Sequence, residues 1–465
     1  MGSFKPEMKM KQKTSLLALF IIGLLFSCQK QIAYQETDQF NPYLGSKQQY
    51  LSPEKITPLP NNSKLLFVST VNRHGSRFMS SQKDDIAVWT LLKQAKKQNS
   101  LTREGRVLYV QINKLIELQK GNYGLLTTTG KNELKGMGER MYQLNPQFFD
   151  ENRDIQANAT FKERTQDSRD NFLSGLNKKN SLKIELYNGE KGSDYLLRFH
   201  KSTPSYSMYL KEKGWEAQYN EVWNSKSMQE MEDRILNKLF DKEFVLHLQS
   251  KDFEPIPTEG GYTMYHSKDF VNSLFECYKI SKAFTPQLQP KLDNIFTVSE
   301  KSTLSYLADI KAFYQKGPGF EGESMSYSNA VSLLSKVTLE LEKAVNGEQN
   351  KSGYLNFAHA ETTLPLITLL NINDCNEAQD ELKKGSWRAS KWASMGTNIQ
   401  WFVLEIDSKK YIHLRFNEQP ASLPIDSKSK GTFLWEDYSN YVKTLVADYD
   451  VDYKDTNYKK MLLQL

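Results

Sequence analysis

Cysteine is scarce in this chain of 465 residues, which contains three. Cys28 lies near the amino terminus, and only Cys277 and Cys375 follow it. The sequence leaves open whether these last two form a disulfide, because it does not show that they are close in space. No group of cysteine and histidine residues has the spacing of a zinc site, so we expect neither a structural metal nor a cofactor.

A strong excess of one charge is also missing. The formal net charge is +6, and residues 1–27 carry half of it through four lysines and one glutamate. The remaining 438 residues therefore have a net charge of +3. So small an excess does not give the basic footprint of a nucleic-acid-binding protein, and we expect no nucleic-acid partner.

No apolar run is long enough to cross a bilayer as a helix. The longest extends from Leu16 to Phe26; several lysines precede it and Ser27-Cys28 follow it. This arrangement is typical of an export signal, and Leu25-Phe26-Ser27-Cys28 resembles a bacterial lipobox. We expect removal of residues 1–27 and a lipid on Cys28, which would anchor an exported protein at the periplasmic or outer-membrane surface.

The strand signals lie in the first and last thirds of the chain. Residues 28–60 are polar, and we interpret them as a tether and N-terminal extension. The predicted strands that follow are 64–71, 154–160, Tyr354–Ala358, 399–404 and 411–414. The last two are joined by Asp407-Ser408-Lys409-Lys410 and form a predicted hairpin.

Helical periodicity dominates the middle of the chain. It covers 226–250, 268–284, 302–315 and 327–345, and residues 84–120 have the same pattern. The simplest architecture is an α/β core with an inserted, mostly α-helical cap. We assign residues 61–190 and 350–465 to the core and 191–349 to the cap, to which the helical residues 84–120 could add; we find no internal repeat.

The most informative motif is Arg73-His74-Gly75-Ser76-Arg77, directly behind the apolar run that predicts the first strand. Open α/β sheets bind ligands at the carboxyl ends of their strands. Two guanidinium groups beside an imidazole suit the oxygens of a phosphoryl group. The motif therefore predicts phosphoryl transfer at His74.

Two further segments follow predicted strands. Arg164 opens a helix that runs to Leu176, and a helix N-terminus attracts anions. Taken alone, this Arg is equally well explained as an exposed residue beside an ordinary cap. His359-Ala360-Glu361 precedes a helix that we expect to start at Thr362-Thr363-Leu364-Pro365. His359 could donate to a phosphoryl oxygen, and Glu361 could protonate a leaving oxygen.

A third segment, Leu126-Thr127 with Gly130, Leu134, Gly138 and Arg140, is better explained structurally. Its glycines permit close packing, and its leucines belong in the core.

Together these motifs resemble the histidine acid phosphatase family, clade 2 of the histidine phosphatase superfamily. Most of that family ends its site with His-Asp, and the variant His359-Ala360-Glu361 resembles the multiple inositol polyphosphate phosphatase branch. Further similar stretches are Asn41–Gly45, Leu196–Phe199 and Tyr306–Tyr314. One departure is Phe78-Met79-Ser80, where relatives often have an aromatic residue and then proline.

The resemblance implies a phosphoglycerate mutase-like core, a phytase activity and a role for each motif residue. His74 would be the nucleophile and Glu361 the proton donor. Phosphate would be bound by Arg73, Arg77, Arg164 and His359. It implies no metal, a small inositol polyphosphate as substrate, and a monomer.

Two other functions stay open. The chain could be a broader acid phosphatase acting on sugar phosphates or bisphosphoglycerate, or an inactive surface protein that binds phosphorylated ligands. The lysines that could favour phytate, Lys93, Lys96, Lys97, Lys131 and Lys135, are as easily explained as solvated helix faces. The other histidines, His200, His247, His266 and His413, are expected in the cap or core, and His200 is the first to examine.

Overall fold

The computed structural model describes residues 40–251 and 253–465. The predicted signal peptide, 1–27, and the predicted lipidation site, Cys28, lie outside the described residues. The elements below belong to one unit, Pro42–Leu465. Within the described part, no helix is both long and apolar enough to cross a membrane.

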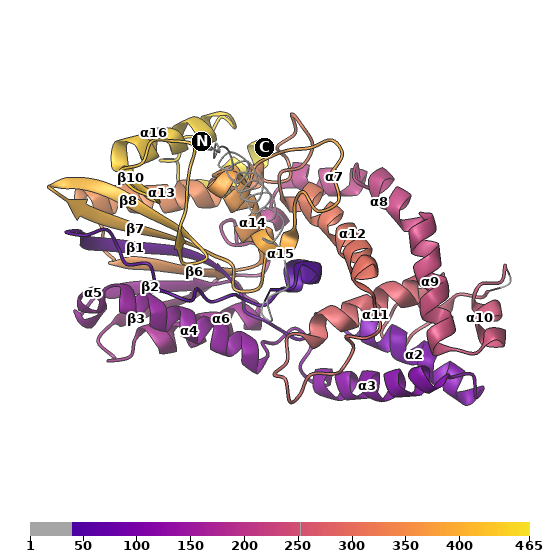
Figure 1. Cartoon of the computed structure of the whole chain (residues 1–465). Helices are drawn as coiled ribbons and strands as arrows, with labels where there is room; N and C mark the ends of the chain where they lie inside the picture. Colours follow the sequence, from indigo (N-terminus) through magenta and orange to yellow (C-terminus); the bar gives the residue numbers. More distant parts are fainter. Residues whose placement is uncertain (1–39, 252) are drawn as a thin grey trace, which may run out of the picture. The chain divides into compact units, whose positions relative to one another are not determined.

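A mixed eight-stranded sheet forms the centre of the fold (Figure 1). The strand order is β10-β8-β7-β1-β6-β2-β3, and β9 pairs with β8. Strands β1, β6, β2 and β3 are parallel, whereas β7, β8, β9 and β10 pair antiparallel. The bounds are β1 Lys64–Arg73, β2 Asp154–Ala159, β3 Lys183–Asn188, β6 Gly353–Ala358, β7 Asn398–Ile406, β8 Lys409–Phe416, β9 Gln419–Pro420 and β10 Thr432–Leu434; β4 Ile256–Pro257 and β5 Thr263–Met264 pair separately.

Helices cover both faces of this sheet because successive strand residues point to opposite sides. Val68 and Leu355 pack against α4 and α6 on one face. Phe67 and Val71 pack against α13, α14 and α16 on the other face. The bounds are α4 Thr128–Leu144, α5 Pro146–Asp150, α6 Glu163–Leu176, α13 Val331–Asn346, α14 Ala360–Leu369, α15 Ala389–Trp392, α16 Trp435–Ala447 and α17 Tyr458–Gln464.

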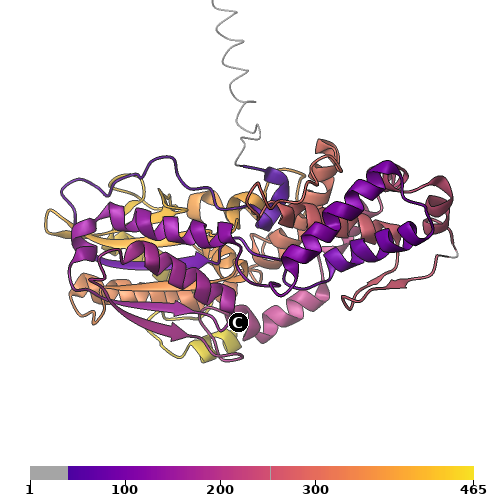
Figure 2. The same ribbon diagram turned by 90° about the horizontal axis from the view of Figure 1, so that it is seen from below.

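A second hydrophobic core forms beside the sheet (Figures 1 and 2). It is built by α2, α3, α9, α10 and α11, with Ile112, Ile235 and Phe270 fully buried. Its helices are α2 Asp84–Lys97, α3 Arg103–Gln119, α9 Lys226–Leu239, α10 Lys242–Leu248 and α11 Ser267–Ser281; α7 Pro204–Glu212 and α8 Glu216–Trp223 lie between α3 and α9 in the chain. The short 3-10 segments are η2 Pro42–Lys47, η3 Phe199–Lys201, η4 Ser328–Ala330 and η5 Ile372–Asp374.

Helix α12, Val298–Lys316, joins the two cores. Its first half contributes Leu304 and Leu307 to the second core, and its second half contributes Ile310 and Phe313 to the sheet core. The carboxyl end of α12 therefore reaches the sheet.

The predicted strands are confirmed, including the hairpin of β7 and β8. Its turn is only Asp407-Ser408, and both residues have positive φ, 50° and 62°, as a tight two-residue hairpin turn requires. The sequence did not reveal β3. This edge strand is exposed on both sides along most of its length, so it has no alternation of apolar and polar residues.

The predicted helical segments are confirmed, but two of them are divided. In 84–120 the first helix ends at Lys97, and Thr102 caps the start of the second helix by accepting a hydrogen bond from Gly105 N at 3.0 Å. Asp241 divides 226–250 in the same way, accepting from Phe244 N at 2.9 Å. A polar N-cap residue starts a new helix without interrupting the apolar periodicity.

The two hydrophobic cores cross the segments assigned from sequence, and the second core includes the helices of 84–120, in agreement with the alternative that these residues add to the cap. Helices α2 and α3 precede the segment 191–349 but pack in the second core, whereas α13 lies within it and packs on the sheet. Periodicity identifies an apolar helix face but not the partner of that face. The domain boundaries themselves stay a prediction.

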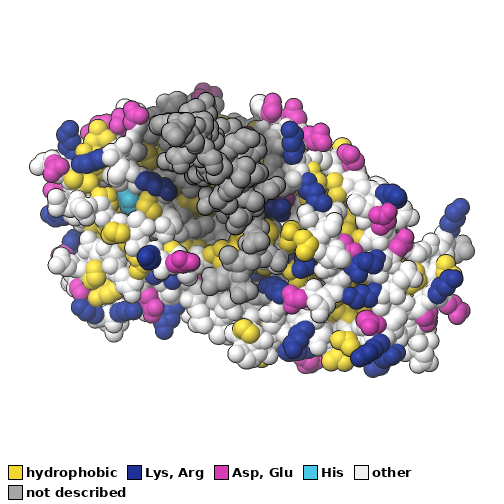
Figure 3. Space-filling model, in the orientation of Figure 1, with side chains coloured by type: hydrophobic (Ala, Val, Ile, Leu, Met, Phe, Trp, Pro, Cys, Tyr) yellow, Lys and Arg dark blue, Asp and Glu magenta, His cyan; other side chains and the backbone are white. Residues whose placement is uncertain are grey.

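Both later cysteines are free and buried, so Cys277 and Cys375 form no disulfide. On the surface shown in Figure 3, basic and acidic side chains are interspersed over the described part.

Candidate active site

Three neighbouring strands end at the same edge of the sheet, and the motif residues follow directly. Arg73, the last residue of β1, pairs in register with Ala358, the last residue of β6. Ala159, the last residue of β2, pairs with Phe357. His74, His359 and Thr160 are therefore the first residues beyond three adjacent strands. The rings of His74 and His359 meet edge to face, with centroids 5.6 Å apart.

The loop after His74 lies in close contact with the start of α4. A Cβ atom on Gly75 would lie 2.5 Å from Gly130 O, and one on Gly130 would lie 1.9 Å from Ser76 O. Both positions therefore require glycine. Thr127 caps α4 by accepting from Gly130 N at 3.2 Å. The prediction that this third segment is structural is confirmed.

Glu133, on the first turns of α4, holds the same loop. Its carboxylate accepts hydrogen bonds from Ser76 N and Ser76 Oγ, both at 2.7 Å, and from Tyr50 N at 3.1 Å. Burial raises the pKa of Glu133 to about 7, against the opposing effect of these donors and of Arg73. Glu133 was not among the residues predicted from sequence, although it lies three residues after Gly130 in the helix that this motif opens.

Arg164 lies in the first turn of α6 and contacts His359. Its Nη2 is 3.3 Å from Nδ1 of His359, and Nε2 of His359 is 3.1 Å from Oγ1 of Thr160. If Arg164 donates to Nδ1, then Nε2 carries the ring proton and donates to Thr160. Both nitrogens of His359 are thus engaged, and in this arrangement the ring orients Arg164.

The other two guanidinium groups are partly held by backbone carbonyls. Nη1 of Arg73 donates to Ser46 O at 2.7 Å and to Ala393 O. Nη1 of Arg77 donates to Phe78 O at 2.7 Å. The Nε atoms of both arginines are buried and have no partner among the described residues. Each guanidinium group is therefore fixed in position and still has N–H groups that can donate to a ligand.

His74 has one ring nitrogen engaged. Nδ1 lies 3.0 Å from Gly75 O, and because a carbonyl only accepts, this nitrogen carries the proton. Nε2 then carries the lone pair. Burial, and the positive charges of Arg164, Arg73 and Arg77, hold the pKa of His74 well below its ordinary value. The site thus presents a neutral imidazole, with a lone pair on Nε2, among three guanidinium groups.

Glu361 lies beside this group, in the first turn of α14. The helix begins at Ala360 with His359 as its N-cap, so the predicted start near Thr362 is wrong, and Pro365 lies inside the helix. Pro365 was misleading because proline marks a first turn only by preference. Oε1 of Glu361 forms an ion pair with Nζ of Lys316 at 2.7 Å. Burial favours the neutral acid, but the ammonium of Lys316 prevails and holds the pKa of Glu361 well below its ordinary value.

All six predicted site residues are thus brought together at one edge of the sheet. A sequence model of the histidine phosphatase superfamily (branch 2) matches residues 64–417. The chain belongs to this superfamily. The α/β fold predicted from sequence is confirmed.

Among curated relatives of this histidine phosphatase is human multiple inositol polyphosphate phosphatase 1, 24% identical over 167 residues, which are 33% of this chain and 34% of the human protein. The probable acid phosphatase DIA3 of Saccharomyces cerevisiae is 21% identical over 413 residues, 84% of this chain and 80% of the yeast protein. The match thus spans about a third of the human relative.

Solved structures show the same fold. The multiple inositol polyphosphate phosphatase of Bifidobacterium longum, crystallised with inositol hexasulfate, has a TM-score of 0.75 at 20% identity and covers 88% of this chain and 98% of its own. The phytase of D. castellii has a TM-score of 0.65 at 18% identity and covers 92% of this chain and 89% of its own. At this identity the likeness is one of fold.

The basic residues near the histidine phosphatase site are not the lysines singled out from sequence. Lys93 and Lys96 cover the rings of Trp89 and Tyr109, and Lys97, Lys131 and Lys135 are exposed helix residues. Lys47 instead lies close enough to Arg77 and Arg73 to feel their charge, and Lys316 contacts Glu361. Burial, followed by the charge of Arg77, lowers the pKa of Lys47 to about 7.

The remaining histidines occupy different environments. His200 lies in η3, is 8% exposed, and interacts electrostatically with Glu361. His266 is the N-cap of α11, His247 is exposed on α10, and His413 is buried in β8 beside Thr432. His200 is therefore the one that adjoins the site.

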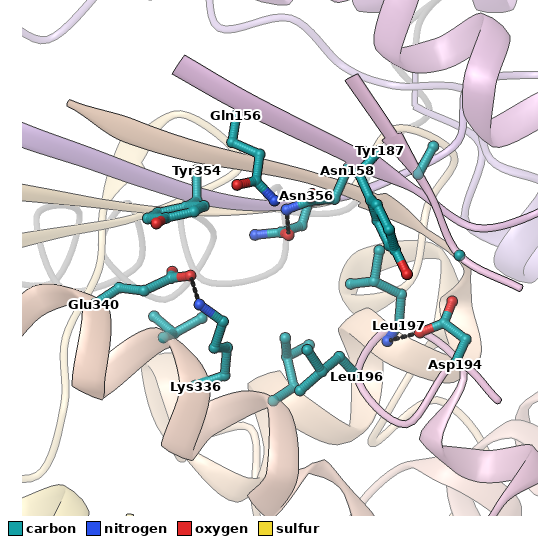
Figure 4. Close-up of a pocket in the computed structure, with 14 residues that line it drawn as sticks. Gln156, Asn158, Tyr187, Asp194, Leu196, Leu197, Lys336, Glu340, Tyr354 and Asn356 are labelled. Atoms are coloured by element: carbon teal, nitrogen blue, oxygen red, sulfur yellow. Dashed lines mark hydrogen bonds and ion pairs between the residues drawn. The ribbon is translucent and has the colours of Figure 1, made fainter. Parts of the chain in front are cut away.

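A separate cavity of about 250 Å³ lies between α13 and strands β2, β3 and β6 (Figure 4). Amide side chains on its sheet side bond to one another, Gln156 to Asn158 and Asn158 to Asn356, each at 2.8 Å. Leucine and valine side chains form much of the opposite wall. None of the six site residues lines this cavity, so it is not the phosphate site.

Ser168 links α6 to the loop of His74. Its Oγ donates to Arg164 O at 2.7 Å and accepts from Gly75 N at 3.2 Å. Ser168→Ala leaves a buried amide without an acceptor, so we expect the free energy of unfolding to fall by about 1–3 kcal/mol. We also expect kcat/KM to fall about tenfold, as the loop of His74 loses its anchor. Denaturant titration and phosphate release measure the two effects.

Ser174→Ala is the matched control, because Ser174 is on the same helix and, among the described residues, its Oγ bonds only to Asn171 O. Equal effects of the two substitutions on activity would contradict the anchoring role of Ser168.

Proposed function

We propose that this protein hydrolyses phosphomonoesters of inositol polyphosphates, with phytate as substrate, through a phosphohistidine at His74. The observation that carries the proposal is the state of His74: a neutral ring whose Nε2 has the free lone pair, surrounded by three guanidinium groups. A group that only bound phosphate would gain more from a charged imidazole.

In the first step, Nε2 of His74 attacks phosphorus as the ester P–O bond breaks. The leaving alkoxide takes a proton from Glu361, so that an alcohol departs and Glu361 becomes a carboxylate. In the second step, Glu361 accepts a proton from water as its oxygen attacks phosphorus. The P–N bond breaks, inorganic phosphate forms, and both His74 and Glu361 return to their starting states.

The three arginines supply the charge that a phosphoryl transition state needs. At a loose transition state the protein contributes mainly position and charge, so donors fixed beforehand are effective. Arg73, Arg77 and Arg164 are held by backbone carbonyls or by His359. We assign these three arginines to the oxygens of the phosphoryl group, and His359 joins them when its Nε2–H exchanges Thr160 for a phosphoryl oxygen.

The substrate class is supported by charge beyond this clamp and by relatives. Lys47 and Lys316 lie at the site, and Arg198 lies near enough to act on His359. A relative of the same fold was crystallised with inositol hexasulfate, a polyanion of similar shape. A second candidate function, an acid phosphatase of broad specificity, is supported by the similarity of this chain to yeast acid phosphatases.

Phosphate release from phytate by the purified protein in EDTA tests the proposal. Release that is independent of metal supports it. Release only from small phosphomonoesters such as glycerol phosphate would move the substrate to the second candidate. Absence of release from either, with retained binding of inositol hexasulfate, would favour an inactive surface protein that binds phosphorylated ligands.

Export and lipid anchoring belong to the same proposal. They are supported by the charge and apolar pattern of residues 1–27 and by Cys28. We expect cells that express the full chain to incorporate labelled palmitate into it, and we expect Cys28→Ser to abolish this. Retention of label in the variant would refute anchoring at Cys28, and Cys277→Ser is the control because that thiol is buried.

A further inference from the structure

The ion pair of Lys316 and Glu361 joins two parts of the fold. Lys316 is the last residue of α12, the helix that spans both hydrophobic cores, and Glu361 is in the first turn of α14. Nζ lies 2.7 Å from Oε1, and Oε2 of Glu361 has no hydrogen-bond partner among the described residues. Among the described residues, neither Lys316 nor Glu361 forms another ion pair.

This pairing conflicts with the first chemical step. A proton donor must arrive protonated, but an adjacent ammonium stabilises the carboxylate and keeps the pKa of Glu361 low. The other groups that face the carboxylate also favour its charged form or are neutral. They are His200 from η3, Tyr206 from α7, His359 at the start of α14, Arg73, Arg77 and Arg164.

Lys316 can move without disturbing the backbone around it. Tyr206 Oη donates to Gln315 O at 2.8 Å, and Gly317 N donates to Phe313 O at 3.0 Å. Ser326 Oγ donates to Gly317 O at 2.7 Å. Since these bonds fix the end of α12, the flexible lysine side chain is free to exchange one anion for another.

We propose that Lys316 determines specificity by leaving Glu361 for a second phosphate of the substrate, so that a neighbouring phosphate on the substrate is what allows Glu361 to carry its proton. The inference rests on the proposed function, in which Glu361 is the donor. Lys316 stays protonated throughout, and the proton that Glu361 gains on substrate binding is the one passed to the leaving oxygen. A phosphate dianion competes well with a carboxylate for an ammonium group.

Three substrates and the variant Lys316→Met separate this role from a structural one. Glycerol phosphate has no second phosphate, and for this substrate we expect kcat of Lys316→Met at pH 6 to be at least about tenfold higher than that of the wild type. The reason is that each unit of increase in the pKa of Glu361 raises its protonated fraction tenfold. The alkaline limb of the pH profile moves to higher pH. With phytate, KM rises severalfold as a phosphate contact is lost.

With 4-nitrophenyl phosphate, the rate of the first-step burst of nitrophenol should stay within about twofold, because this leaving group needs no proton. Lys316→Arg keeps the charge and is expected to restore the wild-type pH profile. Lys211→Met is the matched control, since Lys211 is an exposed lysine in the last turn of α7. An equal fall of kcat for all three substrates in Lys316→Met, or no change in any, would overturn the proposal.

A binding measurement tests the inference without turnover. Calorimetry of inositol hexasulfate binding in two buffers of different ionisation enthalpy gives the number of protons taken up. At pH 5.5 we expect the wild type to take up more protons than Lys316→Met or Glu361→Gln, by up to one, with uptake by His74, His200 and His359 common to all three. Equal uptake overturns the inference. Unequal uptake in a protein that hydrolyses no phosphomonoester would sustain it and refute the proposed function.

Discussion

Replacing His74 by alanine is expected to lower phosphate release from phytate by at least about 10⁴-fold, as the loss of a nucleophile does in other covalent enzymes. Binding of inositol hexasulfate should change little, because the donors of Arg73, Arg77 and Arg164 are positioned by carbonyls and by His359 rather than by His74. Single-turnover release and calorimetry measure the two quantities. The combination separates a nucleophile from a phosphate ligand, since loss of a ligand would weaken both.

His247→Ala is the control for this change. His247 is exposed on α10 and does not adjoin the site, so its variant should retain wild-type release. Release by His74→Ala within tenfold of the wild type would contradict the covalent mechanism. A parallel loss of hexasulfate binding would instead indicate that the clamp collapses without the imidazole.

The sequence was sufficient to predict those site residues that lie next to a recognisable strand or motif. His74, Arg164 and His359 each follow a strand that composition alone reveals, and parallel strands bring their carboxyl ends to one edge. The same reasoning failed at β3, whose exposed side chains leave no pattern. It also failed at the start of α14, where a proline inside the helix was taken to mark its first turn.

Residues that act through distant contacts could not be found in this way. Lys316 and Glu361 are 45 residues apart, and Lys47 precedes the first strand in a segment predicted to be a tether. A lysine on a helix face has the same local signature whether it meets solvent, an aromatic ring or a carboxylate. Lys93 and Lys96 show the consequence, because the sequence left open whether they favour phytate or are solvated, and the structure places them over aromatic rings.

Glu361→Gln is expected to lower kcat for phytate and for glycerol phosphate by about 10²–10⁴-fold, the usual contribution of a general acid. An alkoxide is a strong base and leaves slowly without a proton, whereas 4-nitrophenolate is weakly basic. The same variant should therefore retain most of its first-step rate with 4-nitrophenyl phosphate, which a burst of nitrophenol at stopped-flow times measures. Steady-state turnover of that substrate should still fall, because Glu361 also activates water in the second step.

Glutamine keeps the size of the side chain but cannot give up a proton, so this pattern isolates acid catalysis from packing. Glu436→Gln is the control, since Glu436 is an exposed glutamate in the first turn of α16, a position equivalent to that of Glu361 in α14. If Glu361→Gln slowed the burst with 4-nitrophenyl phosphate as much as it slowed glycerol phosphate, the residue would serve to position the substrate or His359, and the proton would have to come from another group. His200 would then be the first candidate, because it is buried beside Glu361 and its Nδ1 has no partner among the described residues.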